Sequence, residues 1–225
     1  MADVGPRSSF RDLTVGAFVD ELESPAPVPG GGSASAVAAS LGAALVAMVA
    51  SLSEGRPKYA AHADLHQTSR EIGRRLAARF LHLADEDADA YADFAAAMKL
   101  PRDTDEQLAS RKIALSRAAR RAAEVPMLTV EACLELVATA ESLVGRSNAN
   151  ASSDLDVATL LGEAAARGAA ANVLINLPSV DDDSFSGEAT ARVMALLDSV
   201  EEIVATVHAG VRNGELRGPL EPAPG

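Results

Sequence analysis

A carboxylate on an apolar helical face is the first candidate for chemistry in this sequence. Between residues 60 and 98, large side chains recur at steps of three, four and seven: Leu65, Ile72, Leu76, Phe80, Leu83, Tyr91, Phe94 and Met98. Asp87 continues this spacing between Leu83 and Tyr91, so it belongs to the face that must be buried. Burial of an unpaired carboxylate shifts its pKa by about 3 to 5 units. Asp87 is therefore predicted to be either a paired core aspartate or a general acid with a raised pKa.

Asp154 is the second candidate carboxylate. It follows a polar loop and is predicted to lie in the first turn of a helix that continues to Asn176, where the helix dipole favours the ionised form. One neutral and one ionised carboxyl can divide the roles of acid and base. Asn172 shares a helical face with Asp154 but lies about 27 Å farther along the axis, so the two cannot contact one reacting atom. Asn172 and Asn176 are predicted to bond backbone groups or to form an interface.

Residues 25–33 form a candidate binding turn, because prolines stiffen the approach to Gly30, Gly31 and Gly32. Ser33 is expected to cap a helix that begins at Ala34. The free N–H groups of such a helix start suit a carboxylate, a phosphate or a polarised carbonyl. A tight turn that lets the helix pack closely explains the same glycines.

The helix after this turn is predicted to be central and packed on several sides. It carries a stripe of large residues (Val37, Leu41, Leu45, Met48, Val49, Leu52) and a stripe of small ones (Ala36, Ser40, Ala43, Ala47, Ser51). Residues 26–53 hold no charge, so a membrane span is the alternative. The many small residues and the lack of a basic cluster at one end favour a core helix.

The remaining pattern predicts an all-α, single-domain helical bundle with one long central hairpin-like helix pair. The expected helices cover residues 14–24, 60–98, 104–124, 126–144, 154–176 and 186–212. Thr14 should cap the first, with Val15, Phe18, Val19 and Leu22 facing inward. Pro126 should start a new helix, and Gly145 should end it. The domain is placed at residues 1–213, and residues 214–225 are expected to form a flexible tail.

Composition narrows the classes of function. The 225-residue chain has a net charge of −12, which argues against nucleic acid and against anionic membranes as partners. The single cysteine, Cys133, argues against a disulfide framework and suits the cytoplasm. His62 and His66 lack the glutamate of a zinc-binding helix, so we expect a solvated helix face and no metal site.

With these residues in hand, the chain resembles the formiminotetrahydrofolate cyclodeaminase and methenyltetrahydrofolate cyclohydrolase family. The resemblance covers about residues 13–211 and is carried, in order, by residues 29–33, 55–59, 85–91, 100–104, 153–155 and 172–177. It implies an all-helical subunit, usually a homodimer with the site near the subunit contact. It also implies a folate substrate and no metal or other cofactor.

Both reactions of that family pass through a tetrahedral carbon between N5 and N10 of the folate, and both need one group to give a proton and one to take it. We assign the acid to Asp87, and expect Asp154 to be the base or the partner of the cationic methenyl carbon. The resemblance places pterin or carboxylate binding at the Gly30–Ser33 turn and the glutamate tail at Arg56 and Lys58. The further substrate-binding candidates are Asp85, Asn148 and Asn150.

Three functions stay open at this point. The first is the folate enzyme, as a cyclodeaminase or a cyclohydrolase, and the sequence does not decide between these. The second is a related enzyme that acts on another pterin or one-carbon substrate. The third is a non-catalytic helical dimer that docks partners, with the small-residue stripe as its interface.

Overall fold

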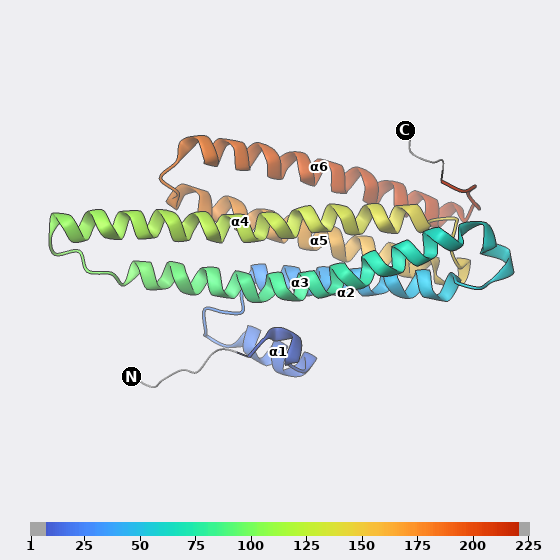
Figure 1. Ribbon diagram of the computed structural model, residues 1–225, viewed down its shortest axis with the longest axis horizontal. Coiled ribbons are helices and arrows are strands. Elements are labelled where there is room, and N and C mark those ends of the chain that lie inside the picture. Colours follow the sequence, from blue (N-terminus) through green and yellow to red (C-terminus); the bar gives the residue numbers. More distant parts are fainter. Residues whose placement is uncertain (1–7, 221–225) are drawn as a thin grey trace.

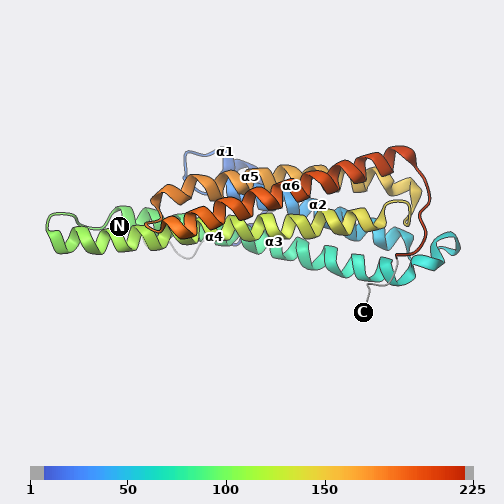
Figure 2. The ribbon, with the colours of Figure 1, turned by 90° about the horizontal axis from the view of Figure 1, so that it is seen from above.

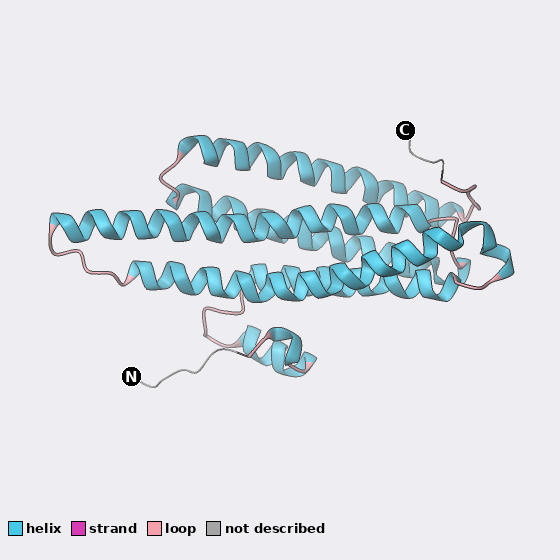
Figure 3. Cartoon of the chain, viewed as in Figure 1, coloured by secondary structure: helices cyan, strands magenta, loops and turns pink. Residues whose placement is uncertain are grey.

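The structure, a computed structural model, describes residues 8–220, which form helices joined by loops, with no strand in that range (Figure 3). The six α-helices are α1 (Val15–Glu23), α2 (Gly31–Ser53), α3 (Ala63–Met98), α4 (Asp105–Leu143), α5 (Ser152–Asn176) and α6 (Asp183–Asn213). Short 3-10 helices, η1 (Phe10–Asp12), η2 (Pro57–His62), η3 (Ala149–Ala151) and η4 (Leu177–Ser179), lie before or between them. The predicted all-α class is confirmed.

The two longest helices, α3 with 36 residues and α4 with 39, form the predicted hairpin along the whole molecule (Figure 1). Helix α2 packs against α3 and α5, while α6 covers α4 and α5 (Figure 2). Helices α2 and α5 run antiparallel, since the N–H of Asn148 bonds Ser53 Oγ at one end and Gly31 adjoins Asn172 at the other. The bundle therefore has two distinct ends, and each contains part of the predicted site.

Small residues let α2 lie very close to its neighbours. A Cβ on Gly73 of α3 would come within 2.8 Å of the backbone oxygen of Ala43 and the backbone nitrogen of Ala47. A Cβ on Gly42 would come within 2.8 Å of the backbone oxygen of Ala158 in α5. The small-residue stripe of α2 is thus largely buried inside the subunit, which removes it as a docking surface.

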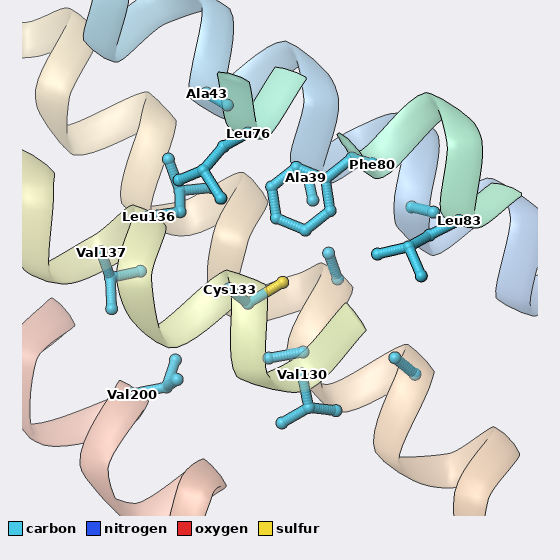
Figure 4. Close-up of a cluster of buried hydrophobic side chains, with 14 of the residues drawn as sticks. Ala39, Ala43, Leu76, Phe80, Leu83, Val130, Cys133, Leu136, Val137 and Val200 are labelled. Carbon is cyan, nitrogen blue, oxygen red and sulfur yellow. The ribbon is translucent and has the colours of Figure 1, made fainter. Parts of the chain in front are cut away.

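The core beside α2 is filled by large side chains from α3 and α4. Figure 4 shows Leu76 and Phe80 of α3 meeting Cys133 and Leu136 of α4, and all four are buried. Burial raises the pKa of the Cys133 thiol to about 12, so this thiol stays protonated and serves as a small apolar side chain.

The large-residue stripe of α2 is partly open to solvent. Leu41, Met48 and Leu52 expose 57%, 38% and 42% of their surface. By length and composition alone, α2 is the single helix within residues 8–220 that could cross a membrane, and half of its most apolar window is buried in the fold. One side of α2 is therefore core, and the other is an uncovered apolar surface.

Helix α4 runs unbroken through Pro126, so the predicted boundary there is wrong. A proline inside a helix has no N–H to donate to the carbonyl four residues earlier, which here belongs to Ala122. The side-chain amide of Asn176 donates to that carbonyl oxygen at 2.9 Å. Helix α5 thus supplies the hydrogen bond that Pro126 cannot make, and α4 continues.

Helix α1 lies outside the bundle. Its predicted cap is confirmed, because Thr14 Oγ1 accepts from the N–H of Ala17 at 3.1 Å. The expected inward face is wrong for Val15, Val19 and Leu22, which expose 82%, 51% and 38% of their surface. Of the four expected residues, Phe18 packs against the core, in edge-to-face contact with the ring of Phe10 in η1.

Two other predictions concern residues near the α4–α5 connection, at the end of the bundle away from the start of α2, and the structure contradicts the first of them. His66 is buried, and its Nε2 lies 2.8 Å from the carbonyl oxygen of Arg146, so the expected solvated face is wrong at this residue. Residues 214–220, expected as a flexible tail, hydrogen-bond the α4–α5 connection through the N–H of Arg217 to the oxygen of Gly145 at 2.9 Å. Residues 221–225 lie outside the described residues.

Candidate active site

The candidate site begins at the first turn of α2. The helix starts at Gly31 with Gly30 as its N-cap, three residues earlier than the sequence predicts. Ser33 is consequently not a cap but a buried residue of the first turn, and its side chain faces α3. The expectation fails because the glycines adopt helical backbone, which lets this end of α2 approach α3.

Asp87 of α3 meets the start of α2 at Ser33. The Ser33 hydroxyl oxygen lies 3.0 Å from Asp87 Oδ2 and 3.1 Å from the carbonyl oxygen of Ala84. The backbone N–H of Ser33 also donates to the carboxyl group. Asp87 thus has the partner that its place on an apolar face requires, and it bonds the end of α2 where N–H groups are free.

Burial raises the pKa of Asp87 above its ordinary value, although the two bonds from Ser33 act in the opposite direction. The geometry at Ser33 is compatible with a protonated carboxyl. A hydroxyl has one hydrogen, so Ser33 can donate to Ala84 or to Asp87 but not to both at once. When Ser33 donates to Ala84, its contact with Asp87 needs a proton on the carboxyl. Asp87 can therefore hold a proton and release it.

Gly32 is the residue that makes this arrangement possible. A Cβ at this position would lie 2.2 Å from Asp87 Oδ1 and 2.5 Å from its carboxyl carbon. Any side chain would push the carboxyl group away from Ser33. Of the two interpretations of the glycines, close packing is the one that the geometry of Gly32 supports directly.

A cleft of about 360 Å³ opens beside the Asp87 carboxyl. It is lined by the approach to α2 and its first turn, the C-terminal part of α3, one residue of α4 and the end of α5: Pro27, Val28, Gly30, Gly31, Gly32, Asp87, Tyr91, Phe94, Ala122, Asn172, Ile175 and Asn176. The walls are mainly apolar and aromatic, with a carboxyl and two amides as the polar side chains. Such a cavity suits a flat, largely apolar ligand with a few hydrogen-bonding groups.

Asn172 and Asn176 make the predicted backbone hydrogen bonds. Asn172 Nδ2 donates to the oxygen of Gly168 at 2.9 Å, and Asn176 Nδ2 donates to the oxygens of Ala122 and Asn172 at 2.9 and 2.8 Å. These bonds fix both amide nitrogens, which leaves the amide oxygens as acceptors beside the cleft. The cleft position itself was not predicted, because it depends on how the end of α5 packs against α3.

Asp85, a predicted substrate-binding residue, contacts the N-terminal segment instead of the cleft. Its Oδ2 accepts from the Ser9 hydroxyl at 2.6 Å, and its Oδ1 accepts from the N–H of Phe10 at 3.0 Å. Asp85 and Asp87 are two residues apart on a helix and therefore point to different sides. Asp85 therefore anchors the N-terminal segment to α3, whereas Asp87 lines the cleft.

The other predicted residues lie at the far end of α2. They are Arg56, Lys58, Asn148, Asn150 and Asp154. Lys58 lies over the ring of Tyr59, with its Nζ 5.4 Å from the ring centre, and Asn148 caps η3 by accepting from the N–H of Asn150 at 3.2 Å. Asp154 is in the first turn of α5, as predicted. The 23 residues of α2 span about 34 Å, so these groups and Asp87 cannot meet within one chain.

Tyr91 and Phe94 are the cleft residues that the sequence pattern assigns to the core. Both follow Asp87 on the same face of α3, and Tyr91 exposes 44% of its surface. Their spacing of four and seven residues from Asp87 is the signal that could have identified them. Across residues 8–220, no group of three or more His, Cys, Asp or Glu side chains could hold a metal ion.

Comparison with known proteins places the chain in a family. A family model described as formiminotransferase-cyclodeaminase matches residues 14–195, and the chain belongs to this family. The methenyltetrahydrofolate cyclohydrolase of Methylorubrum extorquens is 34% identical over 201 residues, which cover 89% of this chain and 96% of that protein. The resemblance inferred from the sequence is confirmed.

Two further matches extend the comparison to a longer protein and to a solved structure. The formimidoyltransferase-cyclodeaminase of Rattus norvegicus is 36% identical over 208 residues, which cover 91% of this chain but only 38% of the rat protein. The crystal structure of formiminotetrahydrofolate cyclodeaminase from Thermotoga maritima aligns with a TM-score of 0.82, over 90% of this chain and 98% of that one. At 24% identity, this structure supports the fold alone.

Proposed function

We propose that this protein is a tetrahydrofolate enzyme that acts on the carbon held between N5 and N10. The proposal depends on one observation: a desolvated carboxyl, Asp87, faces an apolar cleft at the start of α2. Membership in a family whose relatives carry the names of a cyclohydrolase and a cyclodeaminase supports the same chemistry.

The cleft matches the shape and polarity of a pterin. The rings of Tyr91 and Phe94 offer flat apolar contact, and the amide oxygens of Asn172 and Asn176 can accept hydrogen bonds from ring N–H and amino groups. A reduced pterin carries several such donors along one edge. A pterin seated there would bring its N5 side toward the Asp87 carboxyl.

In the hydrolytic reaction, water attacks the methenyl carbon and loses a proton to a base. The carbon–N5 bond then breaks, Asp87 gives its proton to N5, and the hydroxyl proton passes to the Asp87 carboxylate as the formyl group forms on N10, so the one proton released overall is the one that the base took from water. In the cyclodeamination, the formimino group on N5 reacts in its protonated amidinium form (=NH₂⁺): N10 attacks its carbon, loses its own proton to the base and leaves a neutral –NH₂ on the tetrahedral carbon. Asp87 protonates the nitrogen that departs as ammonia, and the methenyl bridge remains. An acid with a raised pKa suits both steps.

We assign the base to Asp154 of a partner subunit, since Asp154 of the same chain is too far away. The uncovered apolar face of α2 supports this arrangement, because Leu41 and Met48 lie near its middle and expose large side chains. A two-fold axis perpendicular to α2 would set two such faces together in antiparallel order. The far end of one α2, with Asp154, Arg56 and Lys58 beside it, would then lie against the cleft of the other.

Mixing two inactive variants tests the shared site. If each site uses Asp87 from one chain and Asp154 from the other, random mixed dimers of Asp87→Asn and Asp154→Asn should regain about a quarter of the wild-type sites. The two variants would be unfolded together and refolded, with each refolded alone as the control. Absence of recovery, although hybrid dimers are shown to form, would place both carboxyl groups in one chain or remove Asp154 from the mechanism.

The absorbance of 5,10-methenyltetrahydrofolate tests the function itself and separates the two reactions. Loss of this chromophore faster than in buffer indicates hydrolysis to the 10-formyl compound. Its appearance from 5-formiminotetrahydrofolate, with release of ammonia, indicates cyclodeamination. If neither change occurs and no tetrahydrofolate binds, the enzyme proposal is wrong and a partner-docking scaffold takes its place.

A further inference from the structure

A second cleft adjoins the one at Asp87. Its volume is about 640 Å³, and its walls come from the end of α3, the start of α4, η4 and the segment that leads into α6. Phe94 lines both clefts, and Asn176 of the first lies two residues before Pro178 of the second. A ligand in the first cleft can therefore extend into the second along α3.

The second cleft contains two cationic side chains from α4, Arg111 and Lys112. Lys112 Nζ is paired with Asp181 at 2.7 Å. Arg111 has no acidic partner within residues 8–220: its Nη2 donates to the carbonyl oxygen of Met98 at 3.1 Å, and its buried Nε has no hydrogen-bond partner there. A guanidinium fixed by one backbone contact and not neutralised by an acid is a good receptor for a carboxylate.

The spacing between the two clefts agrees with the length of a folate. Arg111 is fixed at Met98, which lies 11 residues after Asp87 on α3, or about 16 Å along the helix axis. The aminobenzoyl-glutamate arm beyond N10 spans about 10 Å by ordinary bond lengths. One hydrogen bond of about 3 Å at each end brings the total to about 16 Å, which equals the rise along α3 between Asp87 and Met98.

We propose that Arg111 binds a carboxylate of the glutamate tail and that the second cleft is the subsite for the aminobenzoyl-glutamate arm. Lys112, next to Arg111 in the sequence, is already neutralised by Asp181, so Arg111 is the cation assigned to the tail. This inference rests on the proposed function, because it takes the pterin to occupy the cleft at Asp87.

The sequence pointed to a different pair, Arg56 and Lys58, for the tail. These residues lie at the other end of α2 and reach the cleft only if a second subunit brings them there. Arg111 belongs to the same chain as Asp87 and needs no partner. The two assignments therefore predict different sensitive residues, and mutation can separate them.

The experiment compares tetrahydrofolate with tetrahydropteroate, which lacks the glutamate, by calorimetric binding to the full chain. We expect the wild type to bind tetrahydrofolate more tightly. Arg111→Gln should weaken tetrahydrofolate about 10- to 100-fold, the usual range for a hydrogen bond to a charged group, and should leave tetrahydropteroate unchanged. Arg111→Lys should keep part of the affinity. Arg117→Gln is the matched control, since Arg117 lies on the same helix but lines a separate hollow beside Ile113.

Several results would overturn the inference. Equal wild-type affinity for the two compounds, or no binding of either, would show that no subsite for the tail exists. An equal loss of both compounds in Arg111→Gln would indicate a general structural effect. A loss confined to Arg56→Gln and Lys58→Gln would place the tail at the other end of α2. Because binding is measured without turnover, a protein that binds tetrahydrofolate through Arg111 but catalyses neither reaction would refute the proposed function alone.

Discussion

Substitution of Gly32 by alanine is the sharpest test of how the site is built. The added methyl would lie 2.2 Å from Asp87 Oδ1, 2.5 Å from the carboxyl carbon and 2.6 Å from Oδ2, where ordinary contact begins at 3.4 Å. The carboxyl must therefore move by about 1 Å, and a displacement of this size at a reacting group costs about 100-fold in rate. We expect kcat of Gly32→Ala to fall by about that factor.

The same substitution should lower the free energy of unfolding. Displacing the carboxyl removes its hydrogen bonds to Ser33, at about 1 to 3 kcal/mol, and the better helix propensity of alanine returns about 0.5 to 1 kcal/mol. Urea unfolding measures the stability, and loss of the methenyl chromophore measures the rate. Gly187→Ala is the control, because a Cβ on Gly187 meets open space. Wild-type kcat in Gly32→Ala would refute the close contact between α2 and Asp87 as the basis of the site.

Three further predictions concern pH, packing and assembly. Burial raises the folded pKa of Asp87 above its unfolded value near 4, so its contribution to stability is complete at low pH and is lost as pH rises through the folded pKa. Urea unfolding from pH 4 to 8 should show this loss in the wild type and not in Asp87→Asn. Gly73→Ala forces a methyl group against backbone atoms 2.8 Å away and should lower the free energy of unfolding by about 1 to 3 kcal/mol. Gly187→Ala, where the added Cβ meets open space, should raise the free energy of unfolding by up to about 1 kcal/mol. Equal effects of the two substitutions would refute the argument that Gly73 is needed for close helix packing. Leu41→Glu, on the uncovered face of α2, should shift sedimentation toward a single subunit without loss of helical circular dichroism, and an unchanged sedimentation coefficient would contradict the proposed assembly.

The helices and their caps were largely predictable from the sequence because they depend on local patterns. The spacing of Leu76, Phe80 and Leu83 predicted the buried face of α3, and the same spacing marked Asp87 as unusual. The cap at Thr14 and the αL glycine at Gly145, with φ of 71°, also follow from residue type. Such signals need no knowledge of the neighbouring helix.

Features that depend on contacts between helices were predicted poorly. The continuity of α4 through Pro126 depends on an amide from α5, 54 positions away from the carbonyl of Ala122 that it satisfies. The exposure of Val15 depends on where α1 is attached, and the spacing of apolar residues along α1 does not reveal this. The sequence linked Asp87 and Asp154 through chemistry, but it could not show that α3 and α5 place them at opposite ends of the bundle.

The most direct test of the central claim is the turnover of 5,10-methenyltetrahydrofolate and of 5-formiminotetrahydrofolate by Asp87→Asn, with tetrahydrofolate affinity measured in parallel. If Asp87 gives the proton to the departing nitrogen, kcat should fall by about 10²- to 10⁴-fold on the substrate that the wild type uses, while the affinity stays near the wild-type value. A variant that binds tetrahydrofolate and turns the substrate over at the wild-type rate would show that Asp87 only fastens α2 to α3, and the acid would have to be sought elsewhere.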